Sequence, residues 1–171
     1  MSYATINPYT GQTVATFPDA TDDQVDAALA TAHATFQAWR TTTFAERRAV
    51  LTKAAELLRA DKDALAAILT VEMGKLTAEA LAEVELSAKI FEYYADKAEA
   101  LLAPEPLNVK EKSTGEIVVV REPLGVLFAV EPWNFPYYQL ARIAAPQFSA
   151  GNTLVLKHAS NVPQSAARFE K

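Results

Sequence analysis

Two short segments of the chain carry residue types that could bind a ligand or stabilise a developing charge. In the first, Glu131–Pro136, two prolines stiffen the backbone around Asn134. A side-chain amide held in a rigid loop can donate a hydrogen bond to an oxyanion, and loss of one such donor typically costs about 2.7–4 kcal/mol. Most asparagines in turns bond to nearby backbone groups instead, and spacing alone favours that role for Asn134.

The second segment, Lys157–Ser160, directly follows the apolar run Thr153–Leu156. Lys157 could donate hydrogen bonds to ribose hydroxyls or to a phosphate. A lone lysine at the end of a strand is more often a solvated charge, so the residue alone leaves both roles open. We expect Ser160 to be the N-cap of the final helix, a role that needs no ligand.

Arg142 is a candidate for recognising a substrate carboxylate. It lies in a helical stretch among mostly apolar neighbours, one turn after Tyr138. A guanidinium there could bind a carboxylate through two parallel hydrogen bonds, although a surface arginine is the more common case. Trp133 and Phe135 are, by type, more often packing aromatics than ligand contacts.

The first hundred residues are predicted to form helices behind an extended lead-in over residues 1–20, in which Asn7-Pro8 and Thr10-Gly11 are turn signals. Capping boxes and a C-terminal glycine mark several helix ends. The first predicted helix starts at the capping box Thr21–Gln24 and the second at the capping box Thr43–Glu46. The third covers about 62–73 and ends at Gly74, and the fourth covers about 77–102.

A β-hairpin is predicted after the helices, because Pro104 and Pro106 end the helical region. Its strands would be residues 107–112 and 116–121. Charges alternate with apolar residues in the first strand, which is typical of a hairpin at the edge of a sheet.

The last part of the chain reads as a β-α-β unit. Val126–Val130 is an apolar run typical of a strand buried on both faces, and a helical stretch closed by Gly151-Asn152 leads to a second strand, Thr153–Leu156. Another helix begins after Pro163. Ligands bind at the carboxyl ends of such parallel strands, so Asn134 and Lys157 are expected on one shared edge beside a bound nucleotide.

Composition narrows the function classes. The chain has 171 residues, of which half are hydrophobic and 22% charged, as in a globular domain. The formal net charge of -5 argues against a nucleic-acid partner. The absence of cysteine excludes disulfides and thiolate metal sites, and the two separated histidines, His33 and His158, give no metal-site pattern.

The amino-terminal segment is polar, and the longest apolar stretch, Leu124–Val130, is too short to span a bilayer, so a cytoplasmic protein without a membrane partner is expected. Two parallel strands do not make a stable sheet by themselves. We therefore expect a piece of a larger α/β protein; the alternative is a small domain whose sheet another chain completes.

Several motifs together resemble the aldehyde dehydrogenase family. PLGVLFAVEPWNFP at residues 123–136 resembles the segment that leads into its catalytic asparagine, and GNTLVLKHASNVPQSA at residues 151–166 resembles its cofactor-binding strand and loop. NPYTGQTV near the start, AWR at 38–40 and EMGK at 72–75 are similar to further landmarks in the expected order. The resemblance covers essentially the whole chain.

This resemblance implies an incomplete α/β fold: N-terminal helices packed on the first β-α-β unit of a Rossmann-like cofactor domain, with a β-hairpin arm for oligomerisation. Residues 1–104 and 124–171 would belong to the NAD(P)-binding domain and residues 105–123 to the arm, with the catalytic domain absent. The family binds dinucleotides without the GxGxxG fingerprint, which this chain also lacks. A homo-oligomer, dimer or tetramer, is implied for the full-length enzyme.

The resemblance also assigns roles to single residues. Asn134 matches the oxyanion-hole asparagine, Lys157 the lysine that contacts the adenosine ribose, and Phe135 the aromatic residue near the aldehyde channel, while Pro132 and Trp133 match residues on the nicotinamide side of the pocket. The residues expected to contact the cofactor are Pro132, Trp133, Asn134, Lys157 and Ser160.

Two details resemble the succinate-semialdehyde dehydrogenases. Arg142, eight residues after Asn134, matches the arginine that recognises the substrate carboxylate, and KHASNVP is similar to bacterial members. Ser160 stands where relatives that use only NAD often carry glutamate, whose charge would repel a 2′-phosphate. The expected cofactor is therefore NAD or NADP, with the choice open.

The implied reaction of the full-length enzyme is oxidation of an aldehyde, with succinate semialdehyde expected, through a cysteine thiohemiacetal whose oxyanion is held partly at Asn134. The chain has no cysteine and no match to the glutamate that activates water, so we expect it to be inactive alone. The alternative is a non-catalytic nucleotide-binding or assembly module with the same fold. An unrelated helical interaction protein would not explain the two loop motifs.

Overall fold

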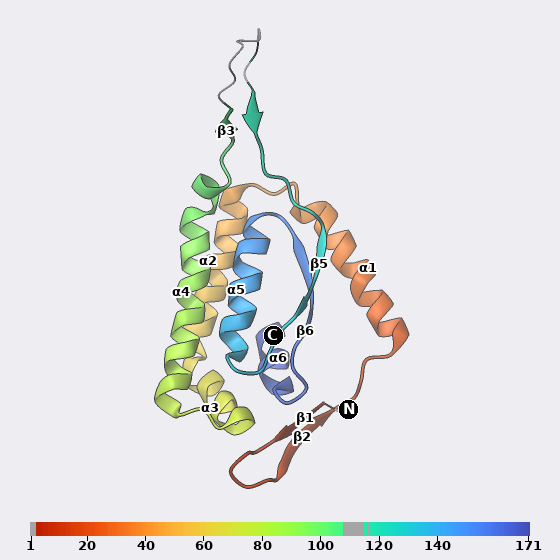
Figure 1. The fold of residues 1–171 in the computed structure, drawn as a ribbon, viewed down its shortest axis with the longest axis vertical. Helices are drawn as coiled ribbons and strands as arrows, with labels where there is room; N and C mark the ends of the chain where they lie inside the picture. Colours follow the sequence, from red (N-terminus) through yellow and green to blue (C-terminus); the bar gives the residue numbers. More distant parts are fainter. Residues whose placement is uncertain (1–2, 108–114, 116) are drawn as a thin grey trace.

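The computed structural model describes residues 3–107, 115 and 117–171. Its body is a row of helices packed against a two-stranded parallel sheet, with one antiparallel hairpin at each end of the long axis (Figure 1). No helix within the described ranges has the length and apolar character needed to cross a membrane.

Four helices lie between residues 22 and 101, as predicted. Both capping boxes form: Thr21 with Gln24, and Thr43 with Glu46. Gly74 adopts the left-handed conformation with φ 69°, which ends the third helix. The four helices are α1 (Asp22–Trp39), α2 (Phe44–Ala60), α3 (Lys62–Met73) and α4 (Thr77–Leu101).

The lead-in is a β-hairpin rather than an unpaired extended segment. Strands β1 (Tyr3–Ile6) and β2 (Thr13–Phe17) pair antiparallel, and the turn between them closes where the Gly11 N–H donates to the Asn7 carbonyl at 2.8 Å. Most side chains of both strands are exposed or half-buried, so the sequence shows little of the alternation that identifies a strand.

The predicted second hairpin is present but begins two residues earlier than expected. Strand β3 (Glu105–Pro106) pairs antiparallel with β4 (Val118–Val119). The Leu107 N–H also donates to the Ile117 carbonyl at 2.8 Å. Most of the first predicted strand, residues 108–112, lies outside the described residues, as does residue 116. The hairpin projects away from the helices (Figure 1).

The β-α-β unit forms as predicted. Its elements are β5 (Val126–Val130), α5 (Pro136–Ser149), β6 (Thr153–Lys157) and α6 (Pro163–Glu170). The two strands are parallel, and their register runs from Val126 opposite Thr153 to Val130 opposite Lys157.

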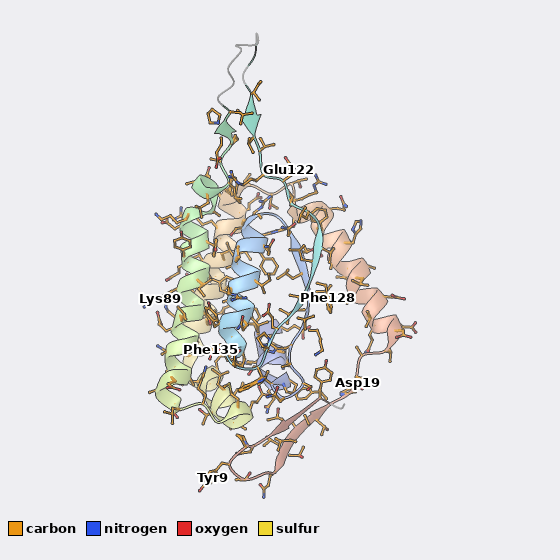
Figure 2. The ribbon with its side chains drawn as sticks, in the orientation of Figure 1. Tyr9, Asp19, Lys89, Glu122, Phe128 and Phe135 are labelled. Atoms are coloured by element: carbon orange, nitrogen blue, oxygen red, sulfur yellow. The ribbon has the colours of Figure 1, made fainter. Side chains whose placement is uncertain are left out.

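The prediction that β5 is buried on both faces was wrong. Ala129 is buried, but Phe128 is 67% exposed and Val130 is 60% exposed (Figure 2). Helix α1 lies over that face mainly along β6, where the Thr153 hydroxyl donates to the Ala32 carbonyl at 3.0 Å. One face of β5 is therefore left largely open in the described residues.

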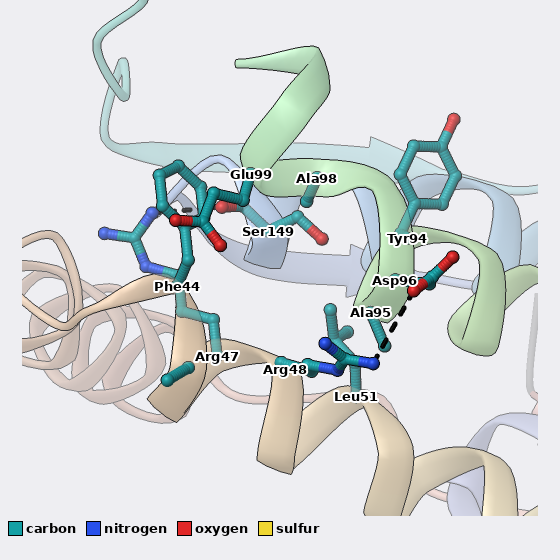
Figure 3. Close-up of a pocket in the computed structure, with 11 residues that line it drawn as sticks. Phe44, Arg47, Arg48, Leu51, Tyr94, Ala95, Asp96, Ala98, Glu99 and Ser149 are labelled. Carbon is teal, nitrogen blue, oxygen red and sulfur yellow. Dashed lines mark hydrogen bonds and ion pairs between the residues drawn. The ribbon is translucent and has the colours of Figure 1, made fainter. Parts of the chain in front are cut away.

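Arg47 joins the carboxyl ends of two helices, and Figure 3 shows it together with Ser149 at the end of α5. Its buried guanidinium donates to the Arg40 carbonyl, just after α1, and to the Ser149 carbonyl at the end of α5, each at 3.0 Å. A guanidinium suits this position because carbonyl groups and the helix dipole both present negative charge there. It lines a small cavity of about 110 Å³, and the carbonyl bonds explain its burial without any ligand.

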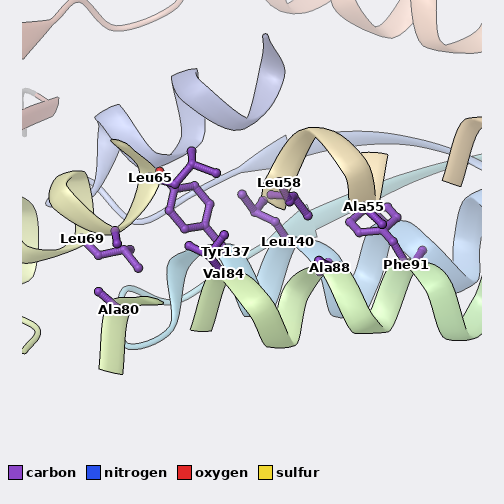
Figure 4. Close-up of a cluster of buried hydrophobic side chains, with 14 of the residues drawn as sticks. Ala55, Leu58, Leu65, Leu69, Ala80, Val84, Ala88, Phe91, Tyr137 and Leu140 are labelled. Carbon is purple, nitrogen blue, oxygen red and sulfur yellow. The ribbon is translucent and has the colours of Figure 1, made fainter. Parts of the chain in front are cut away.

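The core lies between α2, α3, α4 and α5 (Figure 4). Helix α4 supplies a stripe at helical spacing, Ala80, Val84, Ala88 and Phe91, each at most 2% exposed. Tyr137 and Leu140 of α5 pack against this stripe. Because full burial of a large apolar side chain contributes about 1.5–3 kcal/mol, this cluster fixes α5, and hence the end of the loop before it.

Candidate functional site

Strands β5 and β6 end at the same edge of the sheet. Val130 lies opposite Lys157, and the Glu131 N–H donates to the Lys157 carbonyl at 3.1 Å. A five-residue segment follows each strand before the next helix begins: residues 131–135, here called the β5 loop, and residues 158–162, the β6 loop. This is the edge at which open α/β sheets bind ligands.

The β5 loop presents its side chains outward. Pro132 and Asn134 are exposed, and Trp133 and Phe135 are 52% and 44% exposed. The Phe135 ring meets Tyr138 edge-on, with centroids 6.0 Å apart. The side-chain amide of Asn134 makes no hydrogen bond to any residue that the structure describes, so it is not consumed by the turn.

A buried glutamate of α4 caps the helix that follows this loop. Helix α5 begins with Pro136, and its N-cap residue, Phe135, has no side-chain acceptor. The Glu83 carboxylate accepts instead from the backbone N–H groups of Tyr137 at 2.9 Å and Tyr138 at 3.3 Å. Negative charge at a helix N-terminus satisfies unpaired N–H groups and opposes the positive end of the helix dipole.

Lys75 connects the same glutamate to the loop itself. Its ammonium forms a buried ion pair with Glu83. It also donates to the Asn134 carbonyl at 3.4 Å and lies 3.7 Å from the centre of the Phe135 ring. One cation thus contacts the backbone of the oxyanion candidate and the face of its aromatic neighbour.

Ser160 is not the N-cap of the final helix, contrary to the prediction. Helix α6 begins at Pro163 with Val162 as its N-cap residue, so Ser160 lies too early to cap it. The Ser160 carbonyl instead accepts from the Ala4 N–H of β1 at 3.3 Å. Lys157 is exposed, with its ammonium 5.6 Å from the centre of the Tyr3 ring.

A second buried glutamate, Glu72, caps α6 from outside. Its carboxylate accepts from the N–H groups of Gln164 at 2.7 Å and Ser165 at 2.9 Å. It also accepts from the hydroxyls of Ser165 at 2.7 Å and Thr5 at 2.6 Å. One side chain of α3 therefore holds β1 and the start of α6 together.

His158 links the two loops. The Ala159 N–H donates to Nδ1 at 2.8 Å, so Nδ1 accepts and the proton is on Nε2, which donates to the Pro136 carbonyl at 3.1 Å. Burial lowers the pKa of His158, opposed by its bond to Pro136 and by the charges of Glu72 and Glu83. The sequence left this residue's role open; the structure shows a neutral structural histidine.

Arg142 is exposed on α5, and its guanidinium lies 6.0 Å from the centre of the Tyr138 ring. It contributes to an open groove of about 380 Å³ between α4 and α5. Burial raises the pKa of Glu131 in the β5 loop, and the charge of Arg142 opposes that rise. The groove is lined by Leu86, Lys89, Ile90, Tyr93, Tyr94, Tyr138 and Arg142.

The structure thus brings the predicted residues of both loops to one edge and places Arg142 on the helix that leaves it. The sequence interpretation missed Glu72, Lys75 and Glu83 as parts of the site, although EMGK at 72–75 was noted as a motif. One sequence feature could have indicated Glu83: it is a glutamate on the apolar stripe of α4, next to Val84, and a charged residue there needs a buried partner. Among the described residues, no cluster of three or more potential metal ligands occurs.

Comparison with known proteins gives one consistent result. The model of the aldehyde dehydrogenase family matches residues 1–171. A succinate-semialdehyde dehydrogenase [NADP(+)] from Mycobacterium tuberculosis is 53% identical over 166 residues, which cover 97% of this chain and 36% of that protein.

Solved structures agree. The chain superimposes on succinic semialdehyde dehydrogenase from Streptococcus pyogenes, in complex with NADP+, with a TM-score of 0.93 and 46% identity over 98% of this chain and 36% of that one. For succinate-semialdehyde dehydrogenase from Burkholderia pseudomallei, the TM-score is 0.91 at 35% identity, over 99% and 35%. The chain therefore spans about a third of the length of the relatives it matches.

Proposed function

Because this chain belongs to the aldehyde dehydrogenase family, we propose that the full-length protein oxidises succinate semialdehyde to succinate with NADP+ or NAD+ as the electron acceptor. Support for the reaction class comes from the family match, and support for the substrate comes from the relatives, which are named for succinate semialdehyde.

The observation that carries the proposal is the shared edge of the parallel strands. Val130 and Lys157 end neighbouring strands in register, so the β5 loop with Asn134 starts beside the backbone of Lys157. The proposed oxyanion donor, Asn134, and the proposed ribose-binding cation, Lys157, must contact a substrate and a nucleotide that lie side by side. The shared strand edge allows both contacts.

The residues at this edge fit a dinucleotide. The exposed indole of Trp133, with Pro132 beside it, offers an apolar surface for the nicotinamide side, and the exposed Lys157 ammonium offers donors for ribose hydroxyls. When bound, the dinucleotide supplies the hydride acceptor. The chain's own contribution is to bind and orient it beside the aldehyde.

Asn134 is proposed to stabilise the oxyanion formed on the aldehyde oxygen. Its backbone is tied to Lys75, while its side-chain amide makes no hydrogen bond within the described residues. A loop backbone that is already held in place needs little reorganisation when charge develops on the substrate. Phe135 beside it is proposed to line the aldehyde channel.

Ser160 bears on the choice between NADP and NAD. A neutral side chain at this position tolerates the 2′-phosphate of NADP, whereas a carboxylate would repel it. The Streptococcus pyogenes structure holds NADP+, which agrees with NADP as the preferred cofactor.

The nucleophile must come from outside the 171 residues. The family's reaction needs a cysteine thiolate that adds to the aldehyde carbon, and this sequence contains no cysteine. We therefore expect residues 1–171 alone to show no dehydrogenase activity.

Arg142 provides the test of the substrate proposal. In the full-length protein, Arg142→Ala should lower kcat/KM for succinate semialdehyde about 10- to 100-fold, because a hydrogen bond to a charged group is worth about 1.5–3 kcal/mol. An uncharged four-carbon aldehyde should lose less than about twofold. Steady-state kinetics with both aldehydes measures the difference.

Arg48→Ala is the matched control, because Arg48 is an exposed arginine of α2 that pairs with Asp96 away from the groove. It should change neither rate. Equal losses for both aldehydes in Arg142→Ala would remove the carboxylate-recognition role and, with it, the reason to prefer succinate semialdehyde.

A further inference from the structure

The helices that follow the two loops begin in the same unusual way. Each starts with a proline, Pro136 in α5 and Pro163 in α6, and each has an apolar N-cap residue, Phe135 or Val162, that cannot cap it. In each, the next two N–H groups donate to a buried glutamate from another helix. The local sequence supplies no cap at either place, so both helix starts depend on a distant carboxylate.

We infer that Glu83 and Glu72 are positioning residues for the proposed reaction, each acting on one loop. Glu83, with Lys75, sets the β5 loop that carries Asn134, and Glu72 sets the β6 loop that follows Lys157. This inference rests on the proposed function, which places the oxyanion donor and the nicotinamide side of the cofactor at the first loop and the adenosine end of the cofactor at the second.

Both carboxylates are buried, which requires compensation for their lost hydration. Glu83 is 2% exposed and is neutralised by Lys75. Glu72 is 3% exposed and forms no ion pair within the described residues, but it accepts four hydrogen bonds. Each glutamate is thus held in one position by the groups that it orders.

The loops are short enough to transmit that order. Each has five residues, fixed at one end by strand pairing and at the other by the capped helix. The β6 loop is also held at a third place, where the Ala4 N–H donates to the Ser160 carbonyl. The neighbouring Thr5 hydroxyl donates to Glu72. A shift of either helix start therefore moves the loop side chains, and about 1 Å of misplacement can cost about 100-fold in rate.

Lys75 makes the Glu83 arrangement differ from the Glu72 arrangement. Its ammonium contacts the β5 loop directly, through the Asn134 carbonyl and the Phe135 ring. No side-chain cation makes such a contact with the β6 loop in the described part of the chain. The Glu83–Lys75 pair should therefore affect the orientation of the oxyanion donor, and Glu72 the affinity for the dinucleotide.

The experiment compares Glu83→Gln and Glu72→Gln in the full-length protein. Glu83→Gln should lower kcat about 10- to 100-fold and raise the Kd for NADP+ by a clearly smaller factor, about threefold at most, because only the nicotinamide side of the cofactor meets its loop. Glu72→Gln should raise the Kd for NADP+ about tenfold while kcat at saturating NADP+ stays within about twofold. Steady-state kinetics and calorimetric titration with NADP+ give the two quantities separately.

A second set of variants covers the case in which a glutamine variant does not fold. Lys75→Arg keeps the positive charge beside Glu83 and should retain most of kcat, whereas Lys75→Met leaves the buried carboxylate without its cation and should lower kcat. Thr5→Val removes one of four bonds to Glu72 and should weaken NADP+ binding alone. The inference is supported if the Glu83 and Lys75 variants mainly lower kcat and the Glu72 and Thr5 variants mainly raise the Kd for NADP+. It is overturned if both groups change kcat and Kd to the same extent, or if neither group changes either quantity.

Amide hydrogen exchange tests the same contacts without substrate or cofactor. Glu83→Gln should speed exchange in a peptide spanning residues 131–140 and leave residues 158–166 unchanged, and Glu72→Gln should do the reverse. A wild-type protein that fails to oxidise succinate semialdehyde would contradict the proposed function, yet exchange would still report on the capping glutamates. Unchanged exchange in both peptides contradicts the inference whatever the substrate is.

Discussion

His158 shows how one side chain can hold two loops together only in its neutral state. Its Nε2–H donates to the Pro136 carbonyl, and its Nδ1 accepts from the Ala159 N–H. A second proton on Nδ1 would break the latter bond and place a charge in a buried site. The lowered pKa of His158 therefore makes folding stability depend on pH.

The sign of this dependence follows from the shift. An unfolded chain protonates His158 near its ordinary pKa of 6.5, whereas the folded chain resists protonation until a lower pH. The stability contributed by His158 is therefore present above about pH 7 and is lost as the pH falls through 6.5 toward the folded pKa. This loss of stability is measured by thermal unfolding of the full-length protein between about pH 7.5 and about pH 5, a range that spans the ordinary histidine pKa.

Two variants isolate the contribution of this residue. His158→Gln should flatten the pH dependence, whereas His33→Gln should leave it intact, because His33 is bonded only to exposed Gln37 on α1. An equally steep loss of stability on acidification in wild type and His158→Gln would contradict this role.

Ser160 gives a prediction about cofactor choice. In the full-length protein, Ser160→Glu should raise the KM for NADP+ about tenfold or more and change the KM for NAD+ little, because only NADP+ places a phosphate near the new carboxylate. Ser160→Ala serves as the control and should shift neither value strongly. Equal effects of Ser160→Glu on both cofactors would remove Ser160 from the adenosine end of the site.

For single residues, the sequence predicts the position of those that are placed by neighbouring segments of the chain. Asn134 and Lys157 follow apolar strands, so topology alone placed them on one edge. The capping role of Glu72 lies outside sequence reasoning, because its partners Gln164 and Ser165 are more than ninety residues away. The expected N-cap role of Ser160 failed for the same reason: the real cap comes from another helix.

Among the elements, helices were the most predictable, since their signals are short-range. Thr21 and Thr43 cap helices through a residue three positions later, as both capping boxes indicated. The hairpin of β1 and β2 was not predicted as paired strands, because its side chains are mostly exposed or half-buried and show no apolar alternation. The exposure of Phe128 was missed because a buried strand and a half-open one share the same composition.

The junction between α5 and β6 depends on close packing of Gly151 against Arg47. Gly151 has φ 92°, and an added Cβ would lie 3.1 Å from three atoms of the guanidinium. Gly151→Ala should therefore combine backbone strain with a small shift of Arg47 that weakens its bonds to the carbonyl partners. We expect a loss of about 2–4 kcal/mol in unfolding free energy, measured by denaturant titration of the full-length protein.

Gly11→Ala is the control, because Gly11 has a similar φ of 70° but no atom within 4 Å of the added Cβ. It should lose only the strain component, about 1 kcal/mol. If the two variants were equally destabilised, the packing of Gly151 against Arg47 would contribute nothing.

At the scale of the whole molecule, two of the exposed apolar surfaces are formed by strands. One face of β5 is exposed, and the hairpin of β3 and β4 stands clear of the body (Figure 1). A run of four apolar residues in the hairpin is 41–55% exposed: Ile117, Val118, Val119 and Val120. Apolar strands that project into solvent are typical of surfaces that pair with another chain.

This surface supports the proposal that residues 105–123 form part of an oligomerisation arm. In the full-length protein, the double variant Val118→Asp with Val120→Asp should reduce the assembly to a smaller species, because charge disfavours strand pairing and burial between copies. Size-exclusion chromatography with light scattering gives the mass of each species. Val14→Asp on β2, where the replaced valine is 53% exposed, is the matched control and should leave the mass unchanged. An unchanged mass in the double variant would mean that the hairpin is not the contact, since two charges in a pairing strand cannot be accommodated without separating the copies.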